Sequence, residues 1–262
     1  MAASAQPPLL FEKRGVHIGI ATINRPEARN AINGDVAEAL ERVVEQTEAD
    51  RDLRVVVLTG AGGKVFSAGA DLKEVSAGNR DKLERKHSGF AGFVYAKRTK
   101  PWIAAVEGLA LAGGCEIALA CDMIVASEGG GFGLPEVTRG LAAAAGGVFR
   151  LPRALPRAIA MELIATGDRL SSERASALGM VNRLASPGKV LNEALAMAEK
   201  IAANAPLAVR ESLIIARTAF DLDEAMLRCL SNDAQERLSQ TEDFREGPLA
   251  FIEKRAPVWK GC

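Results

Sequence analysis

Short runs of apolar, often β-branched residues recur along the first two thirds of the chain and predict strands. Residues 16–24 alternate loosely between apolar and polar positions, whereas residues 53–59 (LRVVVLT) are almost entirely apolar. Residues 102–106 and 122–126 are similarly apolar. Strands that are apolar on both faces are typical of a parallel sheet with helices packed on either side. The pattern therefore predicts an α/β fold.

Helical periodicity alternates with these strands. A helix with one apolar stripe is predicted to begin at Asp35. After the strand at 102–106, a turn over residues 108–114 leads into a short apolar helix over residues 115–121. Strand, turn, helix and strand in this order indicate a compact repeating unit. An earlier stretch has the same order, with a glycine-rich loop at 60–69 in place of the turn.

Two further regions carry helical patterns. Residues 74–100 are charged but contain Phe90, Phe93 and Tyr95, which favours a mobile helical segment with one apolar face. Further helices are predicted at residues 158–166, 172–179, 191–201, 207–217 and 223–238. A Ser-Pro-Gly sequence at 186–188 marks a boundary, which predicts a core of residues 1–188 and a helical C-terminal region of residues 189–262.

Composition narrows the classes of function. The 262 residues, 48% of them hydrophobic and 25% charged, suffice for a folded core, with disorder expected only at residues 1–8. Thirty-three basic residues balance thirty-three acidic ones, which argues against a dedicated nucleic-acid binder. Four cysteines without a Cys-x-x-Cys pair, and only two histidines, predict reduced buried thiols and no metal site.

The chain also lacks the pattern of a membrane protein. The longest apolar stretch, residues 102–126, is interrupted by Glu107, Glu116 and Asp122, so it falls short of the roughly 20 apolar residues that span a bilayer. No basic segment followed by an apolar one opens the chain. A cytoplasmic protein without a membrane partner is therefore expected.

Three familiar motifs match only in part. The Gly-Ala-Gly sequence at 60–62 begins like a dinucleotide fingerprint, but Val65 stands where the third glycine is required. The Gly-Lys pair at 63–64 lacks the leading glycine and the following Ser/Thr of a phosphate-binding loop. Ser67 lacks the first glycine of a nucleophile elbow. None of the three predicts a site.

Two other glycine turns have a chemical use. Gly113 and Gly114 precede the apolar helix, and the first N–H groups of a helix have no internal partners. Residues 67–71 (SAGAD) form a second turn after the first buried strand. If the strands are neighbours, one N–H from each turn can converge on a single oxygen and form an oxyanion hole. The alternative is that both are simply tight turns.

Two glutamates lie in apolar surroundings. Glu116 sits within the apolar helix, and Glu136 follows the sequence Phe-Gly-Leu-Pro at 132–135. A carboxylate buried without a partner is costly, so each glutamate should be paired, protonated or catalytic. Two facing carboxyl groups around one water would supply both acid and base. The alternatives are a helix-dipole role for Glu116 and a salt bridge from Glu136 to Arg139 or Arg153.

The remaining candidates have ordinary explanations. His87 lies among charged residues, which indicates a solvated helix face, and Tyr95 is expected to pack. The tail, residues 246–262, is charged and aromatic. It can close a subunit interface, contact a phosphate-rich ligand or dock as a terminal helix.

Four ordered blocks resemble the enoyl-CoA hydratase/isomerase, or crotonase, superfamily over nearly the whole chain. They are residues 24–31 (NRPEARNA), 66–74 (FSAGADLKE), 112–118 (AGGCEIA) and 132–136 (FGLPE). The resemblance implies a spiral of β-β-α turns followed by a helical trimerisation region. It also implies a homotrimer or a dimer of trimers.

The resemblance further assigns roles to single residues. Ala70 and Gly113 would supply the oxyanion-hole N–H groups. Glu136 matches the glutamate that delivers a proton to the α-carbon, and Glu116 matches the one that orients and deprotonates water. Positions that match coenzyme A contacts in the family are Ala28, Ala68, Asp71, Leu72, Lys73, Phe251 and Lys254, the last two often contributed by a neighbouring subunit.

A narrower likeness concerns the carnitinyl-CoA dehydratases of this family. It rests on residues 147–153 (GVFRLPR) and on tail segments 246–251 (EGPLAF) and 257–261 (PVWKG). Departures from the family pattern are Ala112 in place of a glycine, Glu107 in place of an asparagine, and alanines at 142–145 where relatives often carry a proline and a polar residue.

The resemblance predicts an acyl-CoA hydro-lyase that reversibly adds water, with syn geometry, to a 2-enoyl-CoA to give a 3-hydroxyacyl-CoA. No separate cofactor is implied, since coenzyme A is part of the substrate. The alternatives are carnitinyl-CoA dehydration, an enoyl-CoA isomerase, which usually keeps one of the two glutamates, and a non-catalytic relative that binds a CoA ester or RNA.

Overall fold

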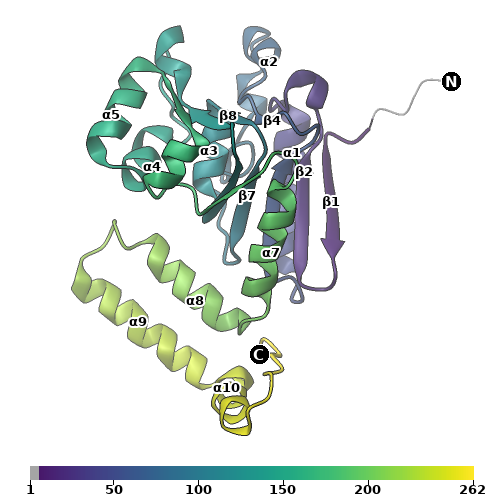
Figure 1. Cartoon of the computed structure of the whole chain (residues 1–262), viewed down its shortest axis with the longest axis vertical. Coiled ribbons are helices and arrows are strands. Elements are labelled where there is room, and N and C mark those ends of the chain that lie inside the picture. The colour runs from purple at the N-terminus through teal and green to yellow at the C-terminus, as the bar shows by residue number, and fades with distance from the viewer. Residues whose placement is uncertain (1–5) are drawn as a thin grey trace, which may run out of the picture.

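The computed structural model describes residues 6–262 (Figure 1). Its central sheet has the strand order β1-β2-β3-β7-β9-β12. The strands are β1 (Leu9–Arg14), β2 (Ile18–Ile23), β3 (Val55–Gly60), β7 (Trp102–Val106), β9 (Met123–Ser127) and β12 (Arg183–Ala185). Only the pairing of β1 with β2 is antiparallel, and the other neighbours run parallel. The strands predicted from the apolar runs are therefore confirmed.

A second, smaller sheet has the order β11-β10-β8-β4. Its strands are β4 (Val65–Ser67), β8 (Leu109–Leu111), β10 (Gly131–Gly133) and β11 (Arg169–Ser171). Each of β3, β7 and β9 is followed by one strand of the smaller sheet and then by a helix or 3-10 helix. The predicted β-β-α spiral is thereby confirmed, and its short second strands lie where the sequence had suggested a loop at 60–69 and a turn at 108–114.

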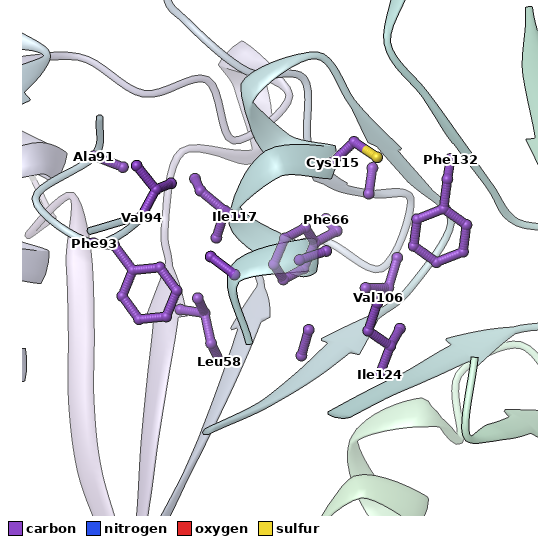
Figure 2. Close-up of a cluster of buried hydrophobic side chains, with 14 of the residues drawn as sticks. Leu58, Phe66, Ala91, Phe93, Val94, Val106, Cys115, Ile117, Ile124 and Phe132 are labelled. Atoms are coloured by element: carbon purple, nitrogen blue, oxygen red, sulfur yellow. The ribbon is translucent and has the colours of Figure 1, made fainter. Parts of the chain in front are cut away.

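The continuous apolar runs have a clear structural cause. Val56 and Leu58 of β3 belong to one buried cluster, whereas Val55 and Val57 belong to another on the opposite face of the sheet. Neighbouring residues of a strand point to opposite faces, so a strand covered on both sides is apolar at every position. Figure 2 shows the first cluster, where Leu58 lies with side chains of the helix after β8 and of the smaller sheet.

The helices cover both faces of the sheet and extend beyond it. They are α1 (Gly34–Ala49), α2 (Leu72–Ser76), α3 (Gly113–Ala120), α4 (Gly147–Ala154), α5 (Arg157–Thr166), α6 (Ser172–Ala177), α7 (Val190–Ala202), α8 (Pro206–Arg217), α9 (Glu224–Ser239) and α10 (Glu242–Glu253). Residues of α1 and α3 pack in the first cluster and those of α7 in the second. Helices α8, α9 and α10 project away from the sheets (Figure 1).

The prediction of a helix over residues 74–100 is wrong. Helix α2 ends at Ser76, a 3-10 helix spans Arg80–Lys82, and a hairpin of β5 (Glu84–Arg85) and β6 (Gly89–Phe90) follows. The backbone then turns at residues 89, 91 and 92, all with positive φ angles that a right-handed helix excludes. Phe90 and Phe93 are nevertheless buried. The spacing of the apolar residues therefore indicated which side chains are buried, but it did not indicate a helix.

Three further expectations concern the ends of the chain and its environment. Expected disorder at residues 1–5 lies outside the described residues, while the carbonyl of Pro8 accepts a 2.8 Å hydrogen bond from Asn24 N–H. The boundary near residue 188 stays a prediction, since α7 directly after it still covers the central sheet. Within residues 6–262, no helix combines the length and apolar character that crossing a membrane requires.

Candidate active site

The two glycine turns lie side by side. Strands β4 and β8 pair in parallel, so the turns that follow Ser67 and Leu111 leave the same edge of the smaller sheet. A Cβ atom added to Gly69 would lie 2.7 Å from Gly113 N, and one added to Gly114 would overlap the carbonyl oxygen of Ser67. Glycine is therefore required for this close approach.

Each turn presents one free backbone N–H. Ile32 donates to Gly69 O, and Asp71 donates to Ile32 O, both at 2.8 Å. This pairing directs the N–H of Ala70 to the other side of the segment. Gly113 is the first residue of α3, and in residues 6–262 neither its N–H nor that of Ala70 has a hydrogen-bond acceptor. Two adjacent free donors are the arrangement that an oxyanion needs.

Glu116 lies in the first turn of α3 and is almost fully buried, with 4% of its surface exposed. Its Oε1 accepts a 2.9 Å hydrogen bond from Gly147 N–H at the start of α4. The pKa of Glu116 is raised to about 7, because burial and the charge of Glu136 raise it more than the N–H of Gly147 lowers it. A carboxyl group that titrates near neutral pH can exchange protons during turnover.

Glu136 lies in a 3-10 helix, Pro135–Arg139, directly after β10. Its Oε2 is buried and has no hydrogen-bond partner in the part of the chain that the structure describes. Burial raises the pKa of this carboxyl group, which nearby Arg139 only partly offsets. Arg153 pairs instead with Asp221 at 2.7 Å. The described residues thus contain neither of the salt bridges considered for Glu136, and its free oxygen is available to a ligand.

The smaller sheet brings the two glutamates to one region. Strand β10 pairs in parallel with β8, and Ala112 N–H donates to Gly133 O at 2.9 Å. The elements carrying Glu116 and Glu136 therefore start from adjacent strand ends. Their proximity is also the reason why the charge of one affects the pKa of the other.

Five of the predicted coenzyme A contacts lie in or near the first glycine turn, at positions 28, 68, 71, 72 and 73. Ala28 ends a short 3-10 helix, and Ala68 N–H donates to the carbonyl of adjacent Arg29 at 3.1 Å. The carboxylate of Asp71 pairs with Arg25 at 3.0 Å and caps α2 through Lys73 N–H at 3.1 Å. Asp71 therefore shapes this turn, while Leu72 and Lys73 on α2 are exposed.

The last two predicted contacts are not brought to the site within one chain. Phe251 is 86% exposed on α10, and Lys254 caps the end of that helix. Helix α10 and helix α2 lie at opposite ends of the molecule (Figure 1). Phe251 and Lys254 can therefore reach a site of this kind only on another copy of the chain.

The sequence interpretation missed the partners of Glu116. Gly147, which binds its carboxylate, was noted only as part of a family likeness. Tyr95 was expected to pack, yet its hydroxyl donates to Ala144 O at 2.9 Å and its ring lies near Arg150. The Gly-Gly pair at 146–147 was the available signal, since glycines at a helix start leave donors open to a ligand. His87 is exposed in the turn between β5 and β6.

Comparison with known proteins gives a consistent result. Residues 13–262 match the family described as enoyl-CoA hydratase/isomerase. A short-chain-enoyl-CoA hydratase of Clostridium acetobutylicum is 38% identical over 251 residues, which are 94% of this chain and 95% of that protein. A carnitinyl-CoA dehydratase of Escherichia coli strain K12 is 41% identical over 245 residues, which are 92% of this chain and 94% of that protein.

Solved structures agree with the sequence comparisons. The crystal structure of enoyl-CoA hydratase from Mycobacterium tuberculosis H37Rv has a TM-score of 0.94 and 46% sequence identity to this chain. The match covers 98% of this chain and 100% of the chain in that crystal structure. Because sequence and fold match over nearly their whole length, the protein belongs to the enoyl-CoA hydratase/isomerase family and is an acyl-CoA enzyme of the hydratase or dehydratase type.

Proposed function

We propose that the protein catalyses the reversible syn addition of water across the 2,3 double bond of an enoyl-CoA, giving a 3-hydroxyacyl-CoA. The observation that carries the proposal is a pair of carboxyl groups in one region, the buried Glu116 and the half-buried Glu136, together with two free backbone N–H groups. One of the carboxyl groups has a buried oxygen without a partner in the described chain. That arrangement supports a site in which a thioester and a water complete the hydrogen bonds.

In the proposed mechanism the thioester oxygen accepts hydrogen bonds from the N–H groups of Ala70 and Gly113. Each such donor stabilises the developing enolate by roughly 3 kcal/mol. The water oxygen bonds to C3 while its proton passes to Glu116, and the carboxyl group of Glu136 gives a proton to C2. Addition of water changes no oxidation state overall, so neither a metal nor a redox cofactor is needed.

The raised pKa values of both glutamates support these roles. Glu136 must be protonated to act as an acid, and burial raises its pKa. Glu116 must be ionised to act as a base, and its pKa of about 7 leaves a substantial ionised fraction at neutral pH. The two titrations are coupled, so a pH profile reports the pair and not one residue.

Glutamine variants test the proposal. Glu116→Gln and Glu136→Gln should each lower turnover by about a hundredfold or more, because acid–base help is lost. Binding of the CoA ester should survive, since the oxyanion donors are main-chain groups. The measurement is a spectrophotometric hydration assay over enoyl-CoA chain lengths, with exposed Glu162→Gln as the matched control. Wild-type rates in both site variants would contradict the mechanism.

Dehydration of carnitinyl-CoA is the second candidate, because a relative with 41% identity carries that name. A cationic acyl group would need an acidic or aromatic pocket, for which Glu107 and Tyr95 are the candidate side chains. The carboxylate of Glu107 accepts a 3.0 Å hydrogen bond from Gly188 N–H, while Tyr95 lies within electrostatic range of Glu116. The guanidinium of Arg150 lies 5.4 Å from the Tyr95 ring, and its positive charge disfavours a second cation there. Turnover of crotonyl-CoA and carnitinyl-CoA, measured side by side, separates the candidates.

A homotrimer or dimer of trimers in the cytoplasm completes the proposal. Its structural support is the exposure of Phe251 and Ile252 on α10, which a neighbouring subunit would cover. A neighbouring copy would also give Phe251 and Lys254 a substrate to contact.

A further inference from the structure

Arg150 is a half-buried cation without an acidic partner. It lies on α4, and its Nη2 donates to Val94 O at 2.5 Å while its Nη1 donates to Ala145 O at 3.0 Å. None of the ion pairs among residues 6–262 involves its guanidinium. An arginine away from water is normally paired with an acid, because its charge is costly to bury. Here main-chain carbonyls hold the group, so it joins two segments of the chain.

The surroundings leave space for this guanidinium. Gly146 has a φ angle of +115°, and a Cβ atom at this position would overlap Nη1 of Arg150. The rings of Tyr95 and Phe149 lie 5.4 Å and 5.1 Å from Cζ of Arg150, at distances typical of cation–π contacts. The hydroxyl of Tyr95 also donates to Ala144 O. The loop over residues 144–146 is thus held by one side chain from each of two segments.

This loop leads directly to the partner of Glu116. Gly147 follows Gly146 and donates its N–H to Oε1 of Glu116 at 2.9 Å. The carbonyl bound by Arg150, that of Ala145, is only two residues earlier. A shift of the loop would therefore move the donor that orients the carboxylate. The arginine acts on Glu116 through the backbone, in addition to acting through its charge.

Several charged or titratable groups face Glu116 from the surrounding elements. Glu136 raises the pKa of Glu116, and Arg150 lowers it. Tyr95, with a raised pKa, and Cys115, whose pKa burial also raises, are neutral near pH 7. Arg150 is the cation among these groups that offsets the burial of Glu116. Without it, the carboxyl group would ionise at a higher pH.

We propose that Arg150 is a positioning residue for the hydration reaction. Its guanidinium ties Ala145 to Val94, fixes the loop whose Gly147 N–H orients Glu116, and supplies the positive charge that favours the ionised base. The inference rests on the proposed function for its kinetic consequences. The loop geometry and the electrostatic effect on Glu116 do not depend on the substrate.

The test compares Arg150→Met, Arg150→Lys and a control, Arg153→Met. Arg153 lies on the same helix but is exposed and paired with Asp221. For Arg150→Met we expect a kcat at least about tenfold lower, little change in KM, and an acidic limb of the kcat/KM profile that moves to higher pH. Arg150→Lys should keep the acidic limb near its wild-type position and recover part of kcat. Arg153→Met should match the wild type.

A second measurement separates this inference from the proposed function. The pKa of Glu116 is followed by carbon-13 NMR of glutamate-labelled protein, with Glu116→Gln to assign the signal. It should rise in Arg150→Met and stay near the wild-type value in Arg150→Lys. A wild-type enzyme that hydrates no enoyl-CoA would overturn the proposed function, and the NMR titration would still decide the inference. An unchanged Glu116 pKa in a folded Arg150→Met variant would overturn the inference.

Discussion

At the scale of the residue, the candidate site contains one carboxyl group, that of Glu116, in surroundings that disfavour its ionised form. Glu116 is surrounded by apolar neighbours on α3, and its carboxylate accepts a 2.9 Å hydrogen bond from Gly147 N–H. Its pKa rises from an ordinary 4.5 to about 7, so the ionised form is less stable in the folded protein than in the unfolded chain. In its ionised form the residue therefore lowers the stability of the folded protein, at a position that is proposed to be catalytic.

This cost predicts a pH-dependent gain in stability for Glu116→Gln. Because the pKa is raised in the folded protein, Glu116 contributes its full share to wild-type stability below pH 4.5, where it is protonated. This contribution to the free energy of unfolding is lost as the pH rises to about 7. Glutamine does not ionise. The free energy of unfolding of the variant minus that of the wild type should therefore increase by up to roughly 3 kcal/mol between about pH 4.5 and about pH 8. Melting temperatures at both pH values measure the effect. Equal pH dependence in wild type and variant would contradict the raised pKa, and exposed Glu162→Gln is the control.

At the scale of the element, the proposed oxyanion site requires a close approach between the turn after β4 and the turn before α3. Helix α3 begins against the turn after β4, where Gly114 lies so close to the carbonyl oxygen of Ser67 that a Cβ atom would overlap it. The free N–H of Gly113 is one residue from this contact and that of Ala70 is three residues from it. Their separation is therefore set by the absence of a side chain at Gly114. A small displacement of α3 would misalign the donors with a bound oxygen.

Gly114→Ala should lower kcat by about a hundredfold, because shifts near 1 Å at a catalytic group have effects of that size. Alanine favours a helix more than glycine does, so a loss of activity would report the clash and not a loss of helix. Steady-state hydration kinetics and a melting curve measure the two effects. Gly247→Ala is the matched helical control, since its added Cβ would lie 3.3 Å from Trp259. Full activity in Gly114→Ala would show that the turns need no such contact.

At the scale of the whole molecule, α8, α9 and α10 extend beyond the sheets and leave large apolar side chains exposed. Phe220 is 77% exposed and Ile252 is 76% exposed. Exposed apolar surface of this kind marks an interface in a stable protein. A partner copy would remove that surface from water and carry α10 toward a neighbouring site.

The chain should therefore sediment as three or six copies. Phe251→Ala should raise KM for an acyl-CoA by about tenfold, the loss expected for one good contact, while kcat stays nearly constant. Analytical ultracentrifugation and kinetics on the same preparation measure both results. Val16→Ala, an exposed apolar residue between β1 and β2 and outside α8, α9 and α10, provides the control. A monomer with a normal KM for acyl-CoA would contradict the assembly and the role of Phe251 together.

The sequence by itself determined the architecture of the core and the family to which the chain belongs. Runs such as residues 53–59 are apolar at every position because the sheet is covered on both faces, and that cause acts locally. The four sequence blocks identified the family, and the resemblance proposed Glu116 and Glu136 as catalytic residues. Gly69, Gly113 and Gly114 indicated two turns, because only glycine allows two backbone segments to approach so closely.

Only the tertiary structure decided which groups meet. Residues 74–100 have apolar spacing that fits a helix, but glycines and positive φ angles fold them into a hairpin and turns. The bond from Gly147 to Glu116, the free oxygen of Glu136 and the distance of Phe251 from the site of its own chain arise between segments far apart in sequence. Periodicity records whether a residue is buried, whereas its partner is fixed by how distant segments pack.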